Sequence, residues 1–151
     1  MTNIRKAQSS DQEFIVQAQV AMAWETEELK LDPGTVKKGV AAVFADPHKG
    51  AYYVAEVAGK PIAVLLTVPE WSDWRNGTVL WIHSVYVAPE CRGQGVYKKM
   101  YEYLHGMVSQ SGGALRGLRL YVDKRNTRAQ KVYQKLGMSA EHYEMFEWLN
   151  S

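Results

Sequence analysis

The sequence of 151 residues has a single cysteine, Cys91, so no disulfide can form within the chain. Its four histidines are scattered, without an HExxH string or a cysteine and histidine pairing, which argues against a metal site. No apolar run approaches the about 18 residues of a membrane span, and the opening MTNIRKAQSSD lacks the apolar middle of a signal peptide. We therefore expect a cytoplasmic protein with no metal and no membrane contact.

A strong excess of one charge is also missing, because the net charge is only +2. The charges are nevertheless unevenly distributed. Residues 1–91 carry 8 Lys and Arg against 11 Asp and Glu, whereas residues 92–151 carry 10 against 5. An RNA-binding domain using the basic half is one interpretation, but the sequence has no repeat of aromatic and basic residues to support it. We expect no nucleic-acid partner, and the uneven charge leaves open either two different ligands or two ordinary solvated surfaces.

Composition and length favour one globular domain spanning residues 1–151. Hydrophobic residues make up 46% of the chain and charged residues 23%, which separates it from disordered sequences. A chain of this length can bury a substantial core, but it leaves no room for a second domain of ordinary size. The sequence leaves open whether the protein forms a homodimer.

Hydrophobic spacing predicts alternating strands and helices in an α+β fold. Ser10 and Glu13 fit a capping box at the first helix, and Asp32 followed by Pro33 fits the start of the second. A strand, a crossover helix and a further strand between residues 79 and 122 imply one parallel pair in a mixed, largely antiparallel central sheet. The predicted strands are residues 2–8, 51–57, 61–68, 78–87, 115–122 and 141–149. About four helices flank the sheet, in the stretches 9–29, 31–47, 96–108 and 126–136.

The stretch SVYVAPECRGQGVYKKMYEYL, residues 84–104, joins a predicted strand to a basic amphipathic helix through a loop with two glycines. The first N–H groups of a helix have no partners within it, so a phosphate is a natural ligand there, and Gly93 and Gly95 permit its close approach. The glycines can equally serve only to turn the chain. The sequence contains no Walker string, and Lys98 stands at the third glycine position of a dinucleotide-binding loop.

A third phosphate-binding pattern fits better. R-x-x-G-x-G/A after a strand is matched by Arg92 to Val96, with Tyr97 in place of the final Gly or Ala. A second pattern, N-x-x-A-x-x-x-Y-x-x-x-G, is matched by Asn126, Ala129, Tyr133 and Gly137. With both patterns in this order, the chain resembles the GNAT superfamily of N-acetyltransferases over nearly its whole length. The resemblance implies the acyl-CoA N-acyltransferase fold, in which the parallel strands splay apart, and acetyl-CoA as co-substrate.

The resemblance also assigns roles to particular residues. The coenzyme pantetheine arm would bond to the strand backbone at Val85, Tyr86 and Val87, and Asn126 would either bond to the coenzyme or serve only as a helix cap. Tyr133 would give a proton to the leaving thiolate, and His83 is one candidate for the base, beside water that leads the proton to Glu25, Glu28 or Glu70. The coenzyme pyrophosphate would bind the loop residues Arg92, Gly93, Gln94, Gly95, Val96 and Tyr97.

The acceptor is predicted from acidic and aromatic residues. Glu25 and Glu28 lie about one turn apart on the first predicted helix, and Asp73 and Trp74 lie in the stretch PEWSDWRNG, which is similar to spermidine/spermine and diamine acetyltransferases. Carboxylates and aromatic faces together suit an alkylammonium. A small cationic amine is the expected partner, while an amino acid, an aminoglycoside and a protein N-terminus stay open. The rival interpretation is a non-catalytic module that binds acyl-CoA or a protein partner on the same fold.

Overall fold

The computed structural model describes residues 1–150, which form two compact units, Met1–Arg119 and the chain from Leu120 onward. Two short 3-10 turns, η1 (Ser9–Asp11) and η2 (Pro89–Cys91), precede α1 and follow β4. The strands of these residues are β1 (Thr2–Lys6), β2 (Ala51–Val57), β3 (Lys60–Ser72), β4 (Gly77–Val87) and β5 (Leu115–Arg119). The helices are α1 (Gln12–Glu27), α2 (Pro33–Ala45), α3 (Val96–Ser109) and α4 (Thr127–Lys135).

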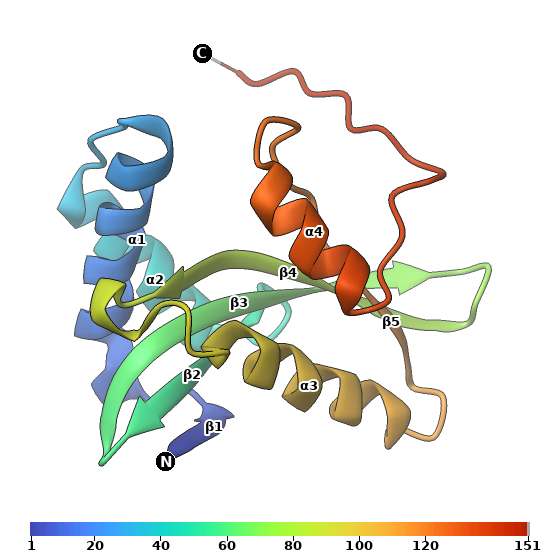
Figure 1. The fold of residues 1–151 in the computed structure, drawn as a ribbon, viewed down its shortest axis with the longest axis horizontal. Helices are drawn as coiled ribbons and strands as arrows, with labels where there is room; N and C mark the ends of the chain where they lie inside the picture. Colours follow the sequence, from blue (N-terminus) through green and yellow to red (C-terminus); the bar gives the residue numbers. More distant parts are fainter. Residues whose placement is uncertain (151) are drawn as a thin grey trace. The chain divides into compact units, whose positions relative to one another are not determined.

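The five strands of the described chain form one sheet in the order β1-β2-β3-β4-β5 (Figure 1). The first four strands are antiparallel neighbours, and only β4 and β5 run parallel. Helix α3 makes the crossover between these two strands, as a parallel pair requires. The predicted α+β class, the mixed sheet and its single parallel pair are therefore confirmed.

The helices of the first unit lie on both faces of this sheet (Figure 1). Ile15 and Ala18 of α1 and Val40 of α2 form a buried cluster with residues of β2 and β3 that include Val54 and Val64. Side chains on the opposite face of β2 meet α3, where the rings of Tyr53 and Tyr103 lie 5.8 Å apart. Met100 and Leu104 of α3 are fully buried. The α1 face and the α3 face of the sheet thus hold separate parts of the core.

Three boundaries differ from the sequence predictions. Strand β3 continues to Ser72 because Glu70 and Trp71 pair with β4, so only a short turn is left of the expected loop. Strand β5 ends at Arg119, where its pairing with Trp81 is the last along β4. The capping box predicted for Ser10 and Glu13 was wrong by two residues, because it lies at Gln8 and Asp11.

The capping box belongs to η1, the turn that leads into α1, and it is built from Gln8 and Asp11. Asp11 is only 5% exposed and its carboxylate accepts the Gln8 N–H at 2.7 Å. At the second helix the Asp32 carboxylate accepts the Thr35 N–H at 2.9 Å, with Pro33 at the first helical position, as predicted. Asp11 also pairs with the partly buried Arg5, which explains why Asp11 and not Glu13 supplies the carboxylate of the box.

The predicted last strand, residues 141–149, is not formed, and the described chain after α4 has no regular structure. Successive residues of an extended chain point to opposite faces, so Met145 would lie on one face and Phe146 and Trp148 on the other. The apolar residues of this segment therefore do not share one face. A strand is stabilised when its apolar residues gather on one buried face. Exposures of 60% for Met145, 91% for Phe146 and 84% for Trp148 agree with this absence of a buried face.

Arg5 ties the first strand to the start of α1. Its guanidinium donates to both carboxylate oxygens of Asp11, at 2.8 and 3.0 Å, and to Glu56 at 2.8 Å. These hydrogen bonds from Arg5 hold the pKa of Asp11 below its ordinary value of 3.8. A carboxylate whose pKa is lower in the folded chain contributes stability above the unfolded pKa, and this stability is lost as the pH falls through the folded value.

We expect Asp11→Asn to lower the free energy of unfolding at pH 7 by about 1–3 kcal/mol, because it removes the charge that satisfies the partly buried Arg5. The deficit should shrink at about pH 2.5, below the ordinary pKa of 3.8, because the stability that the ionised carboxylate contributes is lost as the pH falls toward and through its lowered pKa. Urea unfolding at both pH values measures this. Asp73→Asn is the control, because Asp73 is exposed in the turn between β3 and β4 and should matter little. A deficit equal at both pH values would contradict the linkage.

Within residues 1–150, no helix is both long enough and apolar enough to cross a membrane.

Candidate active site

The loop between β4 and α3 is shaped by two glycines. Gly93 and Gly95 both have a φ of 76°, in the left-handed region, and Gly95 is the residue that precedes the first turn of α3. A side chain at either position would be strained by the backbone alone. A Cβ built on either glycine meets no atom within 4 Å. The glycines therefore set the backbone of the loop and leave the space beside it open.

The N–H groups of this loop are available to a ligand. In the part of the chain that the structure describes, no protein group accepts a hydrogen bond from the N–H of Gly93, Gln94, Gly95 or Val96. The positive end of the α3 dipole lies at the same place, and Lys98 and Lys99 add formal charge in its first turn. Unpartnered donors beside a helix start form an anion site of the kind that holds a phosphate.

Strand β4 separates from β5 just before this loop. The two strands pair from Thr78 to Trp81 only, so the second half of β4 has no partner on that edge in the β5 strand. A register shift against β3, between Val64 and Leu66, marks a bulge on β4, where Ser84 has a φ of 55°. A bulge of this kind bends a strand and increases its twist. The splayed parallel pair that the sequence predicted is thus present within the first unit.

The register identifies which backbone groups lie on the open edge of β4. The Ala88 N–H donates to the Ile62 carbonyl at 2.8 Å, and Tyr86 and Val87 pair with Val64 and Ala63. Hydrogen-bonded and non-hydrogen-bonded pairs alternate along an antiparallel ladder. The backbone groups of Tyr86 therefore face β3, whereas those of Val87 face the open edge. Coenzyme binding by Val85, Tyr86 and Val87 stays a prediction.

Arg92 makes three contacts with the protein although its side chain is exposed. Its Nε donates to the Val87 carbonyl at 2.8 Å, and its Nη2 donates to the Glu25 carboxylate on α1 at 2.8 Å. Its guanidinium carbon lies 5.5 Å from the centre of the Tyr86 ring, within the range of a cation–π contact. The structure thus brings Glu25 and Arg92 together, although the sequence analysis placed the first in an acceptor site and the second in a phosphate site.

His83 directly precedes the bulge at Ser84, on the same face of β4 as Trp81. The two rings are stacked with centres 6.2 Å apart, and burial lowers the pKa of His83 below its ordinary value of 6.5. The imidazole is therefore neutral at pH 7. Cross-strand partners share a face, so Glu70, opposite Val79, also belongs to this side.

Arg119 at the end of β5 is a residue of this face that the sequence analysis missed. Its Nη1 donates to the Glu70 carboxylate at 2.7 Å, and its Cα pairs with Trp81. The pairing joins residues 49 positions apart, so no local spacing indicates it. Only the strand order β3-β4-β5 brings the two side chains together.

The remaining predicted acceptor residues are spread over the first unit. Glu28 ends α1 with a left-handed φ of 50°, whereas Asp73 and Trp74 form the exposed turn between β3 and β4. Figure 1 shows that turn at the far end of the sheet from α1. The structure therefore does not bring Asp73 and Trp74 to Glu25 and Glu28.

Asn126 and Tyr133 belong to the second unit. Asn126 caps α4, because its Oδ1 accepts the Ala129 N–H at 3.1 Å. Burial raises the pKa of Tyr133 above its ordinary value of 10.0, so the phenol is protonated at neutral pH. The cap is confirmed, and the coenzyme contact of Asn126 and the proton donation by Tyr133 stay predictions.

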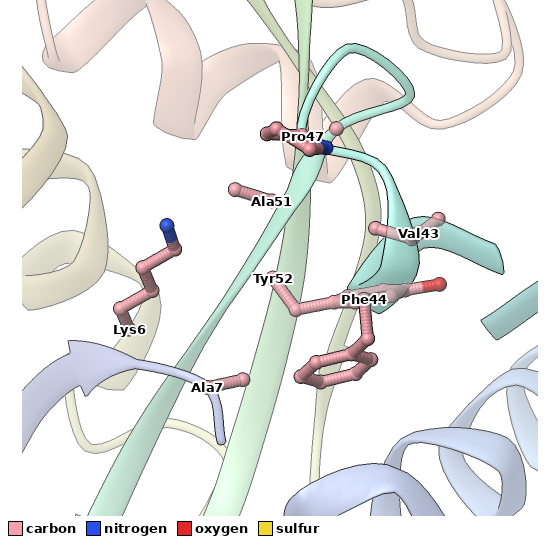
Figure 2. A pocket seen from close by; sticks show the side chains of 8 residues that line it. Lys6, Ala7, Val43, Phe44, Pro47, Ala51 and Tyr52 are labelled. Atoms are coloured by element: carbon pink, nitrogen blue, oxygen red, sulfur yellow. The ribbon is translucent and has the colours of Figure 1, made fainter. Parts of the chain in front are cut away.

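A small cavity of about 80 Å³ lies elsewhere in the first unit (Figure 2). It is too small for a coenzyme, and its walls come from β1, the end of α2 and the start of β2. Its lining residues are Lys6, Ala7, Val43, Phe44, Pro47, Gly50, Ala51 and Tyr52. The cavity therefore has no wall in the loop or in the open edge of β4.

Sequence comparison places this fold and loop in a family. The sequence profile of the Acetyltransferase (GNAT) family matches residues 11–138, which include both the loop and the Asn126 to Gly137 pattern. The chain therefore belongs to the GNAT acetyltransferase family, and it is an acyltransferase by that membership. No significant match is found among the curated proteins.

Solved structures agree with this assignment. A possible acetyltransferase from Clostridium difficile 630 is 37% identical over 100% of this chain and 99% of that chain, with a TM-score of 0.93. A predicted acetyltransferase with acetyl-CoA from Clostridium acetobutylicum is 20% identical over 100% and 96%, with a TM-score of 0.72. AAC(6')-Iy, solved with a bisubstrate analogue made from CoA and acetylneamine, is 17% identical over 100% and 99%, with a TM-score of 0.76. The last two structures, at 20% and 17% identity, show a shared fold.

Proposed function

We propose that the protein is an N-acetyltransferase that transfers the acetyl group of acetyl-CoA to a primary amine of a small cationic acceptor. The observation that carries the proposal is the loop from Arg92 to Val96, whose left-handed glycines and unpartnered N–H groups follow the open edge of β4. A pyrophosphate on the loop and an extended arm along β4 would use the two features together. Acetyl transfer by the family supplies the reaction type.

The proposed reaction is direct attack within a ternary complex. The neutral amine nitrogen attacks the thioester carbonyl carbon, a C–N bond forms, and the C–S bond breaks as the tetrahedral intermediate collapses. The ammonium loses one proton to a base, and the thiolate gains one from an acid. A backbone N–H on the open edge of β4 would stabilise the oxyanion in this scheme. The products are an N-acetyl amine and free CoA.

Tyr133 is the proposed acid and His83 the proposed base. The Tyr133 phenol is protonated at neutral pH, and a CoA thiolate with a thiol pKa near that of cysteine, about 8.5, can accept its proton once both lie in one pocket. His83 is neutral at pH 7, so it can take a proton from an ammonium. Glu70 binds Arg119 in this structure, which supports His83 over a route through that carboxylate.

If His83 is the base, kcat/KM should fall as the pH drops through its lowered pKa, below the ordinary value of 6.5. His83→Gln keeps a planar polar side chain, so it should lower kcat/KM at pH 8 by about 10²-fold or more and abolish this acid limb. A pH profile from 5 to about 9 with both proteins gives the answer. An unchanged limb in His83→Gln would assign the proton to another group.

An amine panel tests the proposed function itself. Acetyl-CoA is mixed with the protein and with alkyl diamines, polyamines, amino acids, aminoglycosides and a peptide N-terminus, and free thiol is followed. We expect thiol release with cationic small amines and little with neutral or acidic ones. Tight coenzyme binding without thiol release from any amine would instead indicate the rival function, a module that binds acyl-CoA without catalysis.

A further inference from the structure

The end of α1 concentrates negative charge where a helix disfavours it. Glu25 and Glu27 lie in its last turn, Glu28 follows, and no basic residue occurs in that turn. The C-terminal end of a helix carries partial negative charge, so carboxylates there are destabilising. Among these three, within residues 1–150, only Glu25 has an ion-pair partner, which is Arg92. The chain thus places an acidic group beside the anion-binding loop at a cost in stability.

Arg92 connects this acidic end to the loop. It is the first residue of the proposed pyrophosphate site, and it binds Glu25 with one nitrogen and the open edge of β4 with another. The Tyr86 ring that contacts the guanidinium is packed against the core, so this contact surface is fixed in place. A phosphate on the loop N–H groups would therefore approach a cation that already has a carboxylate partner.

We propose that the coenzyme pyrophosphate and Glu25 compete for Arg92, so that coenzyme binding releases the Glu25 carboxylate to attract a cationic acceptor. The inference rests on the proposed function and adds a coupling between its two substrates. Glu25 is a positioning residue for Arg92 in the free protein and an electrostatic partner of the acceptor in the complex. By linkage, the acceptor must strengthen coenzyme binding by the same factor.

The relative strengths of the two partners favour this exchange. The side chains of Arg92 and Glu25 are 46% and 38% exposed, and an ion pair at such exposure typically shifts an equilibrium by no more than about fivefold. A pyrophosphate carries more charge than one carboxylate and can accept two parallel N–H bonds from a guanidinium. Loop N–H groups bind the same pyrophosphate, so it holds its position while Arg92 turns.

The first test measures CoA affinity by isothermal titration calorimetry. We expect Glu25→Gln to tighten CoA binding by about threefold, because Arg92 no longer has a competing partner. Glu27→Gln is the matched control, since it removes the same charge from the same turn without touching Arg92. In an Arg92→Met background, Glu25→Gln should change CoA affinity no more than the control does. Equal effects of Glu25→Gln and Glu27→Gln on CoA affinity would overturn the competition. The same gain in CoA affinity from Glu25→Gln in the Arg92→Met background would overturn it as well.

The second test uses spermidine as the cationic probe, with and without saturating CoA. Wild-type protein should bind spermidine about threefold more tightly when CoA is present, and Glu25→Gln should lose this difference. Equal spermidine affinity with and without CoA, or no spermidine binding, would remove the acceptor half of the proposal. Both tests measure binding and need no catalysis. A protein that binds CoA but acetylates no amine would therefore refute the proposed function, and the same binding data would still test the competition for Arg92.

Discussion

Gly95→Glu should abolish acetyl-CoA binding, with a loss of at least about 100-fold. The residue lies at the start of α3 with a φ of 76° and with open space where a side chain would project. A glutamate there would place a carboxylate beside the N–H groups proposed for the pyrophosphate and would repel it. A 100-fold loss of affinity corresponds to about 2.7 kcal/mol of binding free energy. Coulomb repulsion and the obstruction of the site together account for a loss of this size.

Gly59→Glu provides a matched control for the backbone strain. Gly59, in the turn between β2 and β3, has a φ of 78° and also no atom within 4 Å of an added Cβ. Both substitutions should lower the free energy of unfolding by a similar amount, about 1 kcal/mol. Only Gly95→Glu should prevent CoA from raising the melting temperature. Unchanged CoA binding in a folded Gly95→Glu protein would show that the loop is not the coenzyme site.

Tyr133→Phe should lower kcat by about 100-fold while the affinity for acetyl-CoA stays within a few-fold, because it removes only the hydroxyl that would protonate the thiolate. The ring that packs on the apolar side of α4 remains, so the melting temperature should barely change. Single-turnover acetyl transfer and a melting curve measure the two effects. A tyrosine with a purely structural role predicts the reverse, a preserved rate with a modest loss of stability.

Tyr52→Phe is the control for this change. Tyr52 is a buried tyrosine whose pKa, like that of the half-buried Tyr133, is raised by burial, and its ring stacks on Phe44 at 5.8 Å in the core of the first unit. It should lose little activity, since no proposed step uses its hydroxyl. If Tyr133→Phe keeps kcat within about threefold of wild type, or about 0.7 kcal/mol, the acid must be another group.

Local patterns explain why most of the fold could be predicted. The crossover from β4 through α3 to β5 follows from an apolar strand, a glycine loop and an amphipathic helix in succession. The starts of α2 and α4 follow from Asp32 and Asn126, whose side chains cap the helices as their residue types suggest. The segment 141–149 was predicted wrongly, because its short apolar run resembles a strand although its apolar residues do not share one face.

The site was harder to predict, because its side chains meet through the tertiary fold. Gly93 and Gly95 were predicted to admit a phosphate or to turn the chain, and the structure shows both in the left-handed conformation, with a φ of 76°. Glu25, by contrast, was predicted as an acceptor ligand from helix spacing and the family resemblance, and in the structure it binds Arg92, 67 residues away in the sequence. Charge type and spacing predict that a residue will pair with an opposite charge, but only the tertiary fold determines which charged residue is its partner.

The most direct test of the account follows a labelled acetyl group through a single turnover. Protein in excess is mixed with acetyl-CoA, labelled in its acetyl carbons, and with the best amine of the panel, and mass spectrometry locates the label in the amine, the protein, free acetate and CoA. Direct attack in a ternary complex predicts that the label passes to the amine nitrogen, with one free CoA formed for each N-acetyl product. Label left on CoA, released as acetate, or held covalently on the protein would contradict N-acetyl transfer by direct attack.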